Sequence, residues 1–233
     1  MSTHQLTKIL CAADPRGDVD AVERLVRVAG DRGADAIAVV GNLAADGTRA
    51  SYRALFRALG AAGLPTYWVP GPGDAPIAHY LREAHDVGIV HPTLRGVHGT
   101  AALAPDGHLL FAGLGGEVDD APDAAREELD RLRYPRWEAE YRLRILDEFD
   151  ELSPVLLFAT PPAHKGRNVP GSEVLAELVA SHRARLVVCG GEPATELIGR
   201  TLVVAPGSLA DGHFAIVDLH TREVEAGALA GVA

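Results

Sequence analysis

The segments KILCAADPRGD (8–18), AIAVVGN (36–42) and TYWVPGPGD (66–74) decide the fold. Each begins with an apolar run of about five residues, as a buried strand does, and ends in a polar loop that contains glycine. Stretches with helical spacing, 19–29 and 49–59, separate them. The pattern predicts β-α-β-α-β with parallel strands, whose ligands bind at the carboxyl ends of the strands. We therefore expect the loops to converge on one rim.

The middle of the chain predicts different structure. Runs at 100–104 and 108–112 flank a Pro-Asp-Gly turn and predict a β-hairpin. The acidic segment from Glu117 to Asp130 is expected to be exposed and mobile. One helix is expected over 135–152. Its predicted buried stripe consists of Trp137, Tyr141, Ile145 and Phe149.

A second α/β passage follows, with strands at 155–159 and 185–189 around a helix at 173–181. The tail predicts antiparallel strands at 201–204, 213–219 and 224–226. Two strand-rich halves with helices outside predict an α/β fold arranged as a four-layer α-β-β-α sandwich. We expect residues 1–233 to form one domain.

The composition is that of an acidic globular chain of 233 residues, with 47% hydrophobic and 23% charged residues. Lys and Arg number 22 against 32 Asp and Glu, a net charge of −10 that disfavours a nucleic-acid partner. No apolar run approaches the ~20 residues of a membrane helix, and the first residues do not resemble a signal peptide. We therefore expect a cytoplasmic protein with no membrane partner. Cys11 and Cys189 are expected to be buried, reduced thiols.

The loops keep a distinctive order along the chain. They read Asp-x-x-Gly (14–17), Gly-Asn (41–42), Gly-x-x-Asp (71–74), Thr-Pro-Pro (160–162), Cys-Gly-Gly-Glu-Pro (189–193) and Ala-Pro-Gly-Ser-Leu (205–209). Over nearly the whole chain this order resembles the calcineurin-like metallophosphoesterase superfamily. The sequence is most similar to a divergent bacterial phosphoesterase-related branch through GPGDAP (71–76), YPRWEAEYRL (134–143) and PAHKG (162–166). The resemblance implies the same four-layer sandwich and a hydrolase ancestry, with two divalent metal ions that activate a bridging water.

The resemblance also implies that most of the metal ligands are missing. Asp14 matches the first aspartate of the family pattern, but Arg16 replaces a histidine, and a guanidinium has no lone pair for a metal. Asn42 replaces the bridging aspartate, and Thr160 replaces a lone histidine. The remaining replaced positions, which have no side-chain donor, are Pro72, Gly73, Gly191 and Pro193. We therefore expect no two-metal centre and no cofactor, as in a pseudoenzyme.

One interpretation is a non-catalytic module that binds a small phosphate-containing or nucleotide-like ligand. Its predicted binding residues are Asp14, Arg16, Asn42, Asp74, Thr160 and Lys165. Arg167 could add to their positive charge. Arg16 would hold the anion where a metal cation sits in the family. The alternative for Arg16 is an ion pair with Asp14 or Asp74 that fills the emptied site.

Two other interpretations stay open. An active phosphoesterase would use one Mn, Fe, Zn or Ca ion, with ligands drawn from Asp14, Asn42, Asp74, His98 and Glu117. His164 is the candidate general acid or base, because its pKa lies near neutrality. In the third interpretation the chain is a scaffold, and its acidic segment and the 135–152 helix contact a partner subunit, which includes a homo-oligomer.

Overall fold

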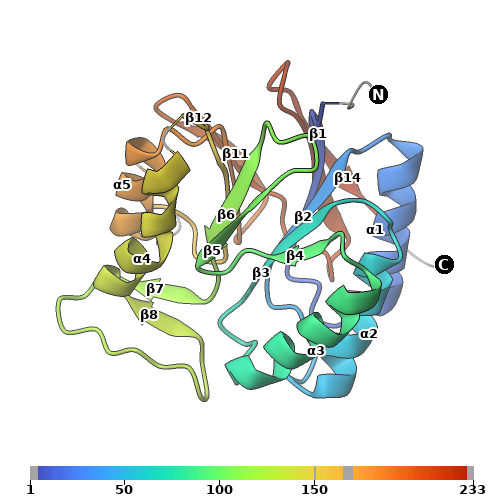
Figure 1. The fold of residues 1–233 in the computed structure, drawn as a ribbon, viewed down its shortest axis with the longest axis horizontal. Helices are drawn as coiled ribbons and strands as arrows, with labels where there is room; N and C mark the ends of the chain where they lie inside the picture. The colour runs from blue at the N-terminus through green and yellow to red at the C-terminus, as the bar shows by residue number, and fades with distance from the viewer. Residues whose placement is uncertain (1–4, 150, 165–169, 230–233) are drawn as a thin grey trace.

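Two six-stranded sheets face each other in the computed structural model, which describes residues 5–149, 151–164 and 170–229 (Figure 1). The first sheet has the order β14(Val224–Ala228), β13(His213–Asp218), β1(Lys8–Ala13), β2(Ala36–Gly41), β3(Thr66–Pro70) and β4(Leu94–Gly96). The second has the order β11(Ala194–Ile198), β12(Thr201–Ala205), β10(Leu186–Cys189), β9(Val155–Phe158), β6(Leu110–Leu114) and β5(Thr100–Leu103). A small parallel pair joins β7(Glu117–Asp119) to β8(Arg133–Pro135).

Helices cover the outer faces of both sheets (Figure 1). The first sheet is covered by α1(Val19–Asp31), α2(Arg49–Gly60) and α3(Ile77–Val90), and the second by α4(Arg136–Leu143) and α5(Glu173–Ser181). A 3₁₀ helix, η1(Arg144–Phe149), continues α4. Asp18 and Thr48 cap α1 and α2 by accepting backbone N–H groups, so each polar loop also starts a helix.

Three apolar layers separate the four structural layers. Between the sheets, Tyr67 and Phe111 stack with ring centroids 3.6 Å apart, surrounded by buried aliphatic side chains. Another layer, which includes Phe56 and Trp68, lies under α1 to α3, and the third lies under α4 and α5. Burial of this apolar surface is the main force that holds the layers together. The predicted α-β-β-α arrangement is confirmed, and the hairpin β5–β6 and helix α5 form where they were expected.

The predicted buried face of the 135–152 helix is wrong. Trp137 and Tyr141 are 60% and 69% exposed, and the buried residues are instead Ala139, Leu143 and Leu146. The helix changes to 3₁₀ geometry at Arg144, which shortens the repeat to three residues and moves the apolar face. Trp137 and Tyr141 lie before this change and share one face of α4, but that face points to solvent, because Ala139 and Leu143 occupy the face that packs on the second sheet.

Two other predictions need correction. The acidic segment after Glu117 is largely exposed, but it begins as a strand, and Glu127 pairs with Arg133 beside β8. Of the predicted antiparallel tail strands, β13 and β14 do pair antiparallel, but β12 lies in the second sheet, parallel to β10 and antiparallel to β11. Alternating sequence identifies such strands but not their partners. None of the helices in the described ranges combines the length and apolar character that a bilayer-spanning helix requires.

Candidate functional site

The loops after the parallel strands meet at one rim, as the sequence predicted. The N–H of Gly116, after β6, donates to the carbonyl of Pro70 at the end of β3 (2.9 Å), which joins the two sheets there. Gly71 allows the loops to approach closely, because a Cβ at this position would lie 2.3 Å from the backbone nitrogen of Asn42. Gly41 has φ +89°, and a Cβ there would lie 2.3 Å from Oδ1 of Asp14.

Asn42 connects the first loop of the rim to the third. Oδ1 of Asp14 accepts from the backbone N–H of Asn42 (2.8 Å) and from its Nδ2 (3.1 Å). Oδ1 of Asn42 in turn accepts from the N–H of Gly73 (2.8 Å). The side chain of Asn42 therefore donates to Asp14 in the first loop through Nδ2 and accepts from Gly73 in the third loop through Oδ1.

Arg16 lies beside Asp14 and remains accessible. Its Nη2 is 3.9 Å from Oδ2 of Asp14, too far for a hydrogen bond, and its side chain is 54% exposed. The backbone of Arg16 is fixed by an N–H···O bond to Asn42 (3.0 Å) in a left-handed conformation, φ +46°. This geometry leaves guanidinium N–H groups available to an anion that reaches the rim.

Asp74 lies beneath the rim rather than on it. It is fully buried and accepts from the N–H groups of Leu43 (2.8 Å), Ala44 (3.1 Å) and Gly71 (2.7 Å), and from the hydroxyl of Tyr52 (3.0 Å). Burial raises the pKa of this carboxyl to about 6, although the hydrogen bonds act in the opposite direction. Asp74 therefore holds the second and third loops together. Because it is buried, it cannot contact a ligand beside Arg16, contrary to the prediction from the sequence.

Thr160 and Glu117 also have partners within the chain. The hydroxyl of Thr160 donates to the carbonyl of Gly116 (3.1 Å) and accepts from the N–H of Val118 (3.0 Å). Glu117 forms an ion pair with Arg131 and lies 3.8 Å from Arg133. These contacts secure the segment between β6 and β7 against the end of β9.

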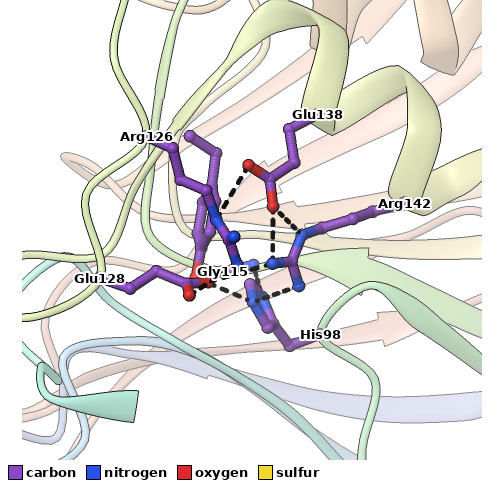
Figure 2. A network of polar contacts seen from close by, with 7 residues as sticks. His98, Gly115, Arg126, Glu128, Glu138 and Arg142 are labelled. Atoms are coloured by element: carbon purple, nitrogen blue, oxygen red, sulfur yellow. Dashed lines mark hydrogen bonds and ion pairs between the residues drawn. The ribbon is translucent and has the colours of Figure 1, made fainter.

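His98 belongs to a polar network that sequence reasoning did not predict (Figure 2). Its Nδ1 accepts from the N–H of Gly115 (2.8 Å), and its Nε2 lies 3.2 Å from the hydroxyl of Tyr134 and 3.4 Å from Nη1 of Arg142. Burial, and then the charge of Arg142, lower the pKa of His98 to about 3. His98 is therefore neutral near pH 7.

Two glutamates neutralise the arginines of this network (Figure 2). Arg142 lies 3.0 Å from Glu128 and 2.7 Å from Glu138. Arg126 contacts the same two carboxylates at 2.7 Å and 3.3 Å. The sequence signal for one of these pairs was the four-residue spacing of Glu138 and Arg142 within α4.

His164 lies beside the edge strand β11. Its Nδ1 is 4.0 Å from Oε2 of Glu196, a residue that sequence reasoning missed. Lys165 and Arg167, the other predicted anion ligands, lie outside the described residues. Within the described ranges, no three His, Cys, Asp or Glu side chains gather as metal ligands.

The chain is similar to known proteins over most of its length. A family model described as metallophosphoesterase, calcineurin superfamily, matches residues 49–229. The crystal structure of TT1561 from Thermus thermophilus is 44% identical, with a TM-score of 0.91 over 96% of this chain and 99% of that chain. A search of curated proteins gave no match.

Two more distant structures share the fold alone. An archaeal phosphodiesterase is 11% identical, with a TM-score of 0.55 over 95% of this chain and 99% of that chain. A dimetal phosphatase from Danio rerio is also 11% identical, with a TM-score of 0.58 over 92% of this chain and 93% of that chain.

Proposed function

Because this chain belongs to the calcineurin-like metallophosphoesterase superfamily, we propose that its own side chains replace the two-metal centre and that the rim binds a phosphate-type anion through Arg16. The observation that carries this proposal is that oxygens of the rim side chains already accept hydrogen bonds from the chain. Oδ1 of Asp14 and Oδ1 of Asn42 both accept from N–H groups of the chain, and Asp74 is buried below them. Two divalent ions need several oxygen or nitrogen ligands that converge on them, and this arrangement does not fit that requirement.

Arg16 supplies the charge for the proposed binding. A guanidinium presents N–H groups in a planar fork that matches two phosphate oxygens. Its backbone is fixed by the bond to Asn42, whereas its side chain extends past Asp14 into solvent. Asp14 neutralises part of the charge at 3.9 Å, so we expect moderate affinity and a marked dependence on salt.

The direct test is calorimetric titration of the protein with inorganic phosphate at low salt. Arg16→Ala should weaken binding about tenfold or more, because a charge-assisted contact is lost. Arg57→Ala is the matched control, since it removes the same charge from an exposed position on α2. Equal affinities for the wild type and Arg16→Ala would reject the anion site.

A second measurement addresses the replaced metal centre. Protein incubated with excess Mn²⁺ and then desalted should retain less than one ion per chain, and it should not hydrolyse a phosphodiester. Retention of two ions per chain, with turnover, would overturn the proposal. The loss of phosphate binding in Arg16→Ala is independent of this result, so the two parts of the proposal can fail separately.

One observation favours a second candidate, an active phosphoesterase with a single ion. Oδ2 of Asp14 takes part in no hydrogen bond among the described residues, and its side chain is partly exposed. The other predicted ligands argue against this candidate, because His98 and Glu117 contact arginines and Asp74 is buried. Stoichiometric binding of one Mn²⁺ that Asp14→Asn abolishes would support it. His164 stays a predicted general acid or base for that reaction.

A further inference from the structure

A groove opens at the end of the sandwich opposite the rim. The residues that line it lie at the start of β10 and β12, at the end of α5 and in the turn between β13 and β14. Its volume is about 720 Å³. The rim lies at the carboxyl ends of the same parallel strands, so the two sites are separated by the length of the sheets. Nothing in the proposed function of the rim involves this groove.

Four arginines surround the groove, although the chain carries a net charge of −10. They are Arg183, Arg185, Arg200 and Arg222, and His220 lies beside them. The residues that line the groove include no aspartate or glutamate. Within the described ranges, none of the four guanidiniums lies within ion-pair distance of a carboxylate. Asp218, the nearest acid in sequence to His220, accepts instead from backbone N–H groups of its own turn.

Hydrogen bonds to the backbone hold two of these arginines in place. Arg185 donates to the carbonyl of Leu219 (3.0 Å), and Arg222 donates to the carbonyl of Arg200 (2.8 Å). The side chains of Arg183 and Arg200 make no hydrogen bond among the described residues. The end of α5 offers a favourable dipole to Arg183, but this effect does not account for the other three cations.

The backbone at two of these positions favours other residues. Arg183 has φ +49° and Arg222 has φ +64°, a left-handed conformation in which glycine or asparagine is less strained. A residue chosen only to complete a turn would rarely be arginine there. At Arg183, whose side chain makes no hydrogen bond among the described residues, the strain accompanies a charge that those contacts do not use.

The floor of the groove is apolar. Its lining includes the partly accessible side chains of Ala180 and Ile198, backed by the buried side chains of Ala184, Leu202 and Leu219. Such a surface excludes water from an apolar body while the rim of guanidiniums holds a charged group. A single carboxylate would balance only one of the four cations, whereas a phosphate or diphosphate carries more charge and matches the guanidinium fork.

We propose that this groove is a second ligand site, which binds an organic phosphate with its phosphate groups on Arg183, Arg185, Arg200 and Arg222 and its apolar body on the floor. The cavity volume is within the range of small-molecule sites, ~300–1,000 Å³. Arg185 and Arg222 are held in place by their carbonyl bonds, whereas the guanidiniums of Arg183 and Arg200 keep their N–H groups for the ligand.

The experiment uses the full chain carrying Arg16→Ala, so that the rim does not contribute. Adenosine 5′-diphosphate and inorganic pyrophosphate are titrated by calorimetry at low salt, because the two share a diphosphate and differ in the apolar body. The double variant Arg183→Ala/Arg200→Ala should weaken diphosphate binding about a hundredfold, since it removes two charge-assisted contacts without breaking a backbone bond. The matched control Arg27→Ala/Arg57→Ala removes the same charge from exposed positions on α1 and α2.

The proposal predicts that the control binds as the parent does and that adenosine 5′-diphosphate binds more tightly than pyrophosphate. It would be overturned by an absence of binding in the parent at millimolar ligand, by equal affinities for the parent and the groove variant, or by equal losses in the groove variant and its control. Thermal unfolding of each variant without ligand verifies that the fold is intact. If Arg183→Ala/Arg200→Ala fails to fold, Arg183→Gln/Arg200→Gln keeps polar side chains and gives the same readout.

Discussion

Charged groups at the two ends of the parallel strands differ in whether they have partners within the chain. At the carboxyl ends, buried groups are paired within the chain, as Asp74 is by four donors and Arg142 is by Glu128 and Glu138, and Arg16 is the exposed exception. At the amino ends, the guanidiniums of the groove have no carboxylate partner among the described residues. Removal of one partner from a buried polar pair destabilises a protein, because the other partner is left buried and unsatisfied. Changes at the paired groups of the rim should therefore alter stability, whereas changes at Arg16 and in the groove should alter binding.

The largest effect is expected for Asp74→Ala. The substitution leaves the N–H groups of Leu43, Ala44 and Gly71 and the hydroxyl of Tyr52 without their acceptor in a buried position. We expect the free energy of unfolding to fall by about 4 kcal/mol, because each unsatisfied buried donor costs roughly 1–3 kcal/mol. Urea denaturation followed by circular dichroism measures this change.

Tyr52→Phe is the control for Asp74→Ala, since it removes one of these hydrogen bonds and keeps the ring. It should lower the free energy of unfolding by about 1 kcal/mol. A loss below about 1 kcal/mol for Asp74→Ala itself would mean that the loops at the rim do not depend on this carboxylate.

The next effect is a pH dependence that comes from His98. Its pKa is lowered to about 3 in the folded chain, so below its ordinary value of about 6.5 the unfolded chain binds a proton that the folded chain does not. The stability contributed by neutral His98 is thus present above about pH 6.5 and declines as the pH falls. Between about pH 7 and pH 5 the free energy of unfolding should fall by up to about 2 kcal/mol.

Subtraction of the His98→Gln profile isolates this titration from the other histidines. The difference between wild type and variant should shrink as the pH falls from about 7 to about 5. Asp74 acts with the opposite sign, because its raised pKa makes the folded chain bind a proton more readily as the pH falls through about 6. A constant difference between the wild-type and His98→Gln profiles would show that His98 titrates equally in both states.

Asn42→Asp tests whether a neutral residue at position 42 is needed beside the carboxylate of Asp14. The new carboxylate would keep the bond from Gly73 but would replace the Nδ2 that donates to Oδ1 of Asp14 at 3.1 Å with a charged oxygen. We expect a loss of about 2 kcal/mol in unfolding free energy from the missing hydrogen bond and the repulsion. Added Mn²⁺ should restore part of this loss, as a shift in melting temperature. Asn42→Ala, which adds no charge, should not respond to Mn²⁺, and a response in both variants would contradict the account.

Much of the fold followed from the sequence. Apolar runs bounded by Gly, Pro and Asp located β1, β2 and β3 within a residue of their observed ends, and the family inferred from the order of the loops is confirmed by the family model. Helix α3 was not predicted. Pro76 gives it no side-chain cap, and the exposed Leu81, Ile89 and Val90 obscure its amphipathic pattern.

The site was predictable only in its position. Parallel strands required the loops to meet, but the sequence did not show that Asp74 points into the protein or that Asn42 bonds to both neighbouring loops. Those directions depend on contacts between segments about thirty residues apart, which no local pattern encodes. The pairing of His98 with Arg142, 44 residues away, was hidden for the same reason.

The smallest effect is expected for Arg200→Ala, and its small size is what distinguishes the groove from the rim. The guanidinium of Arg200 makes no hydrogen bond or ion pair among the described residues, and its neighbours in the groove are also cations. Its removal should change the free energy of unfolding by no more than about 0.5 kcal/mol, and reduced repulsion favours a slight gain. Urea denaturation at low and high salt measures the change, and any gain should disappear when salt screens the charges. A loss of about 2 kcal/mol or more would show that this arginine has a structural partner, and the contrast between the two ends of the strands would then fail.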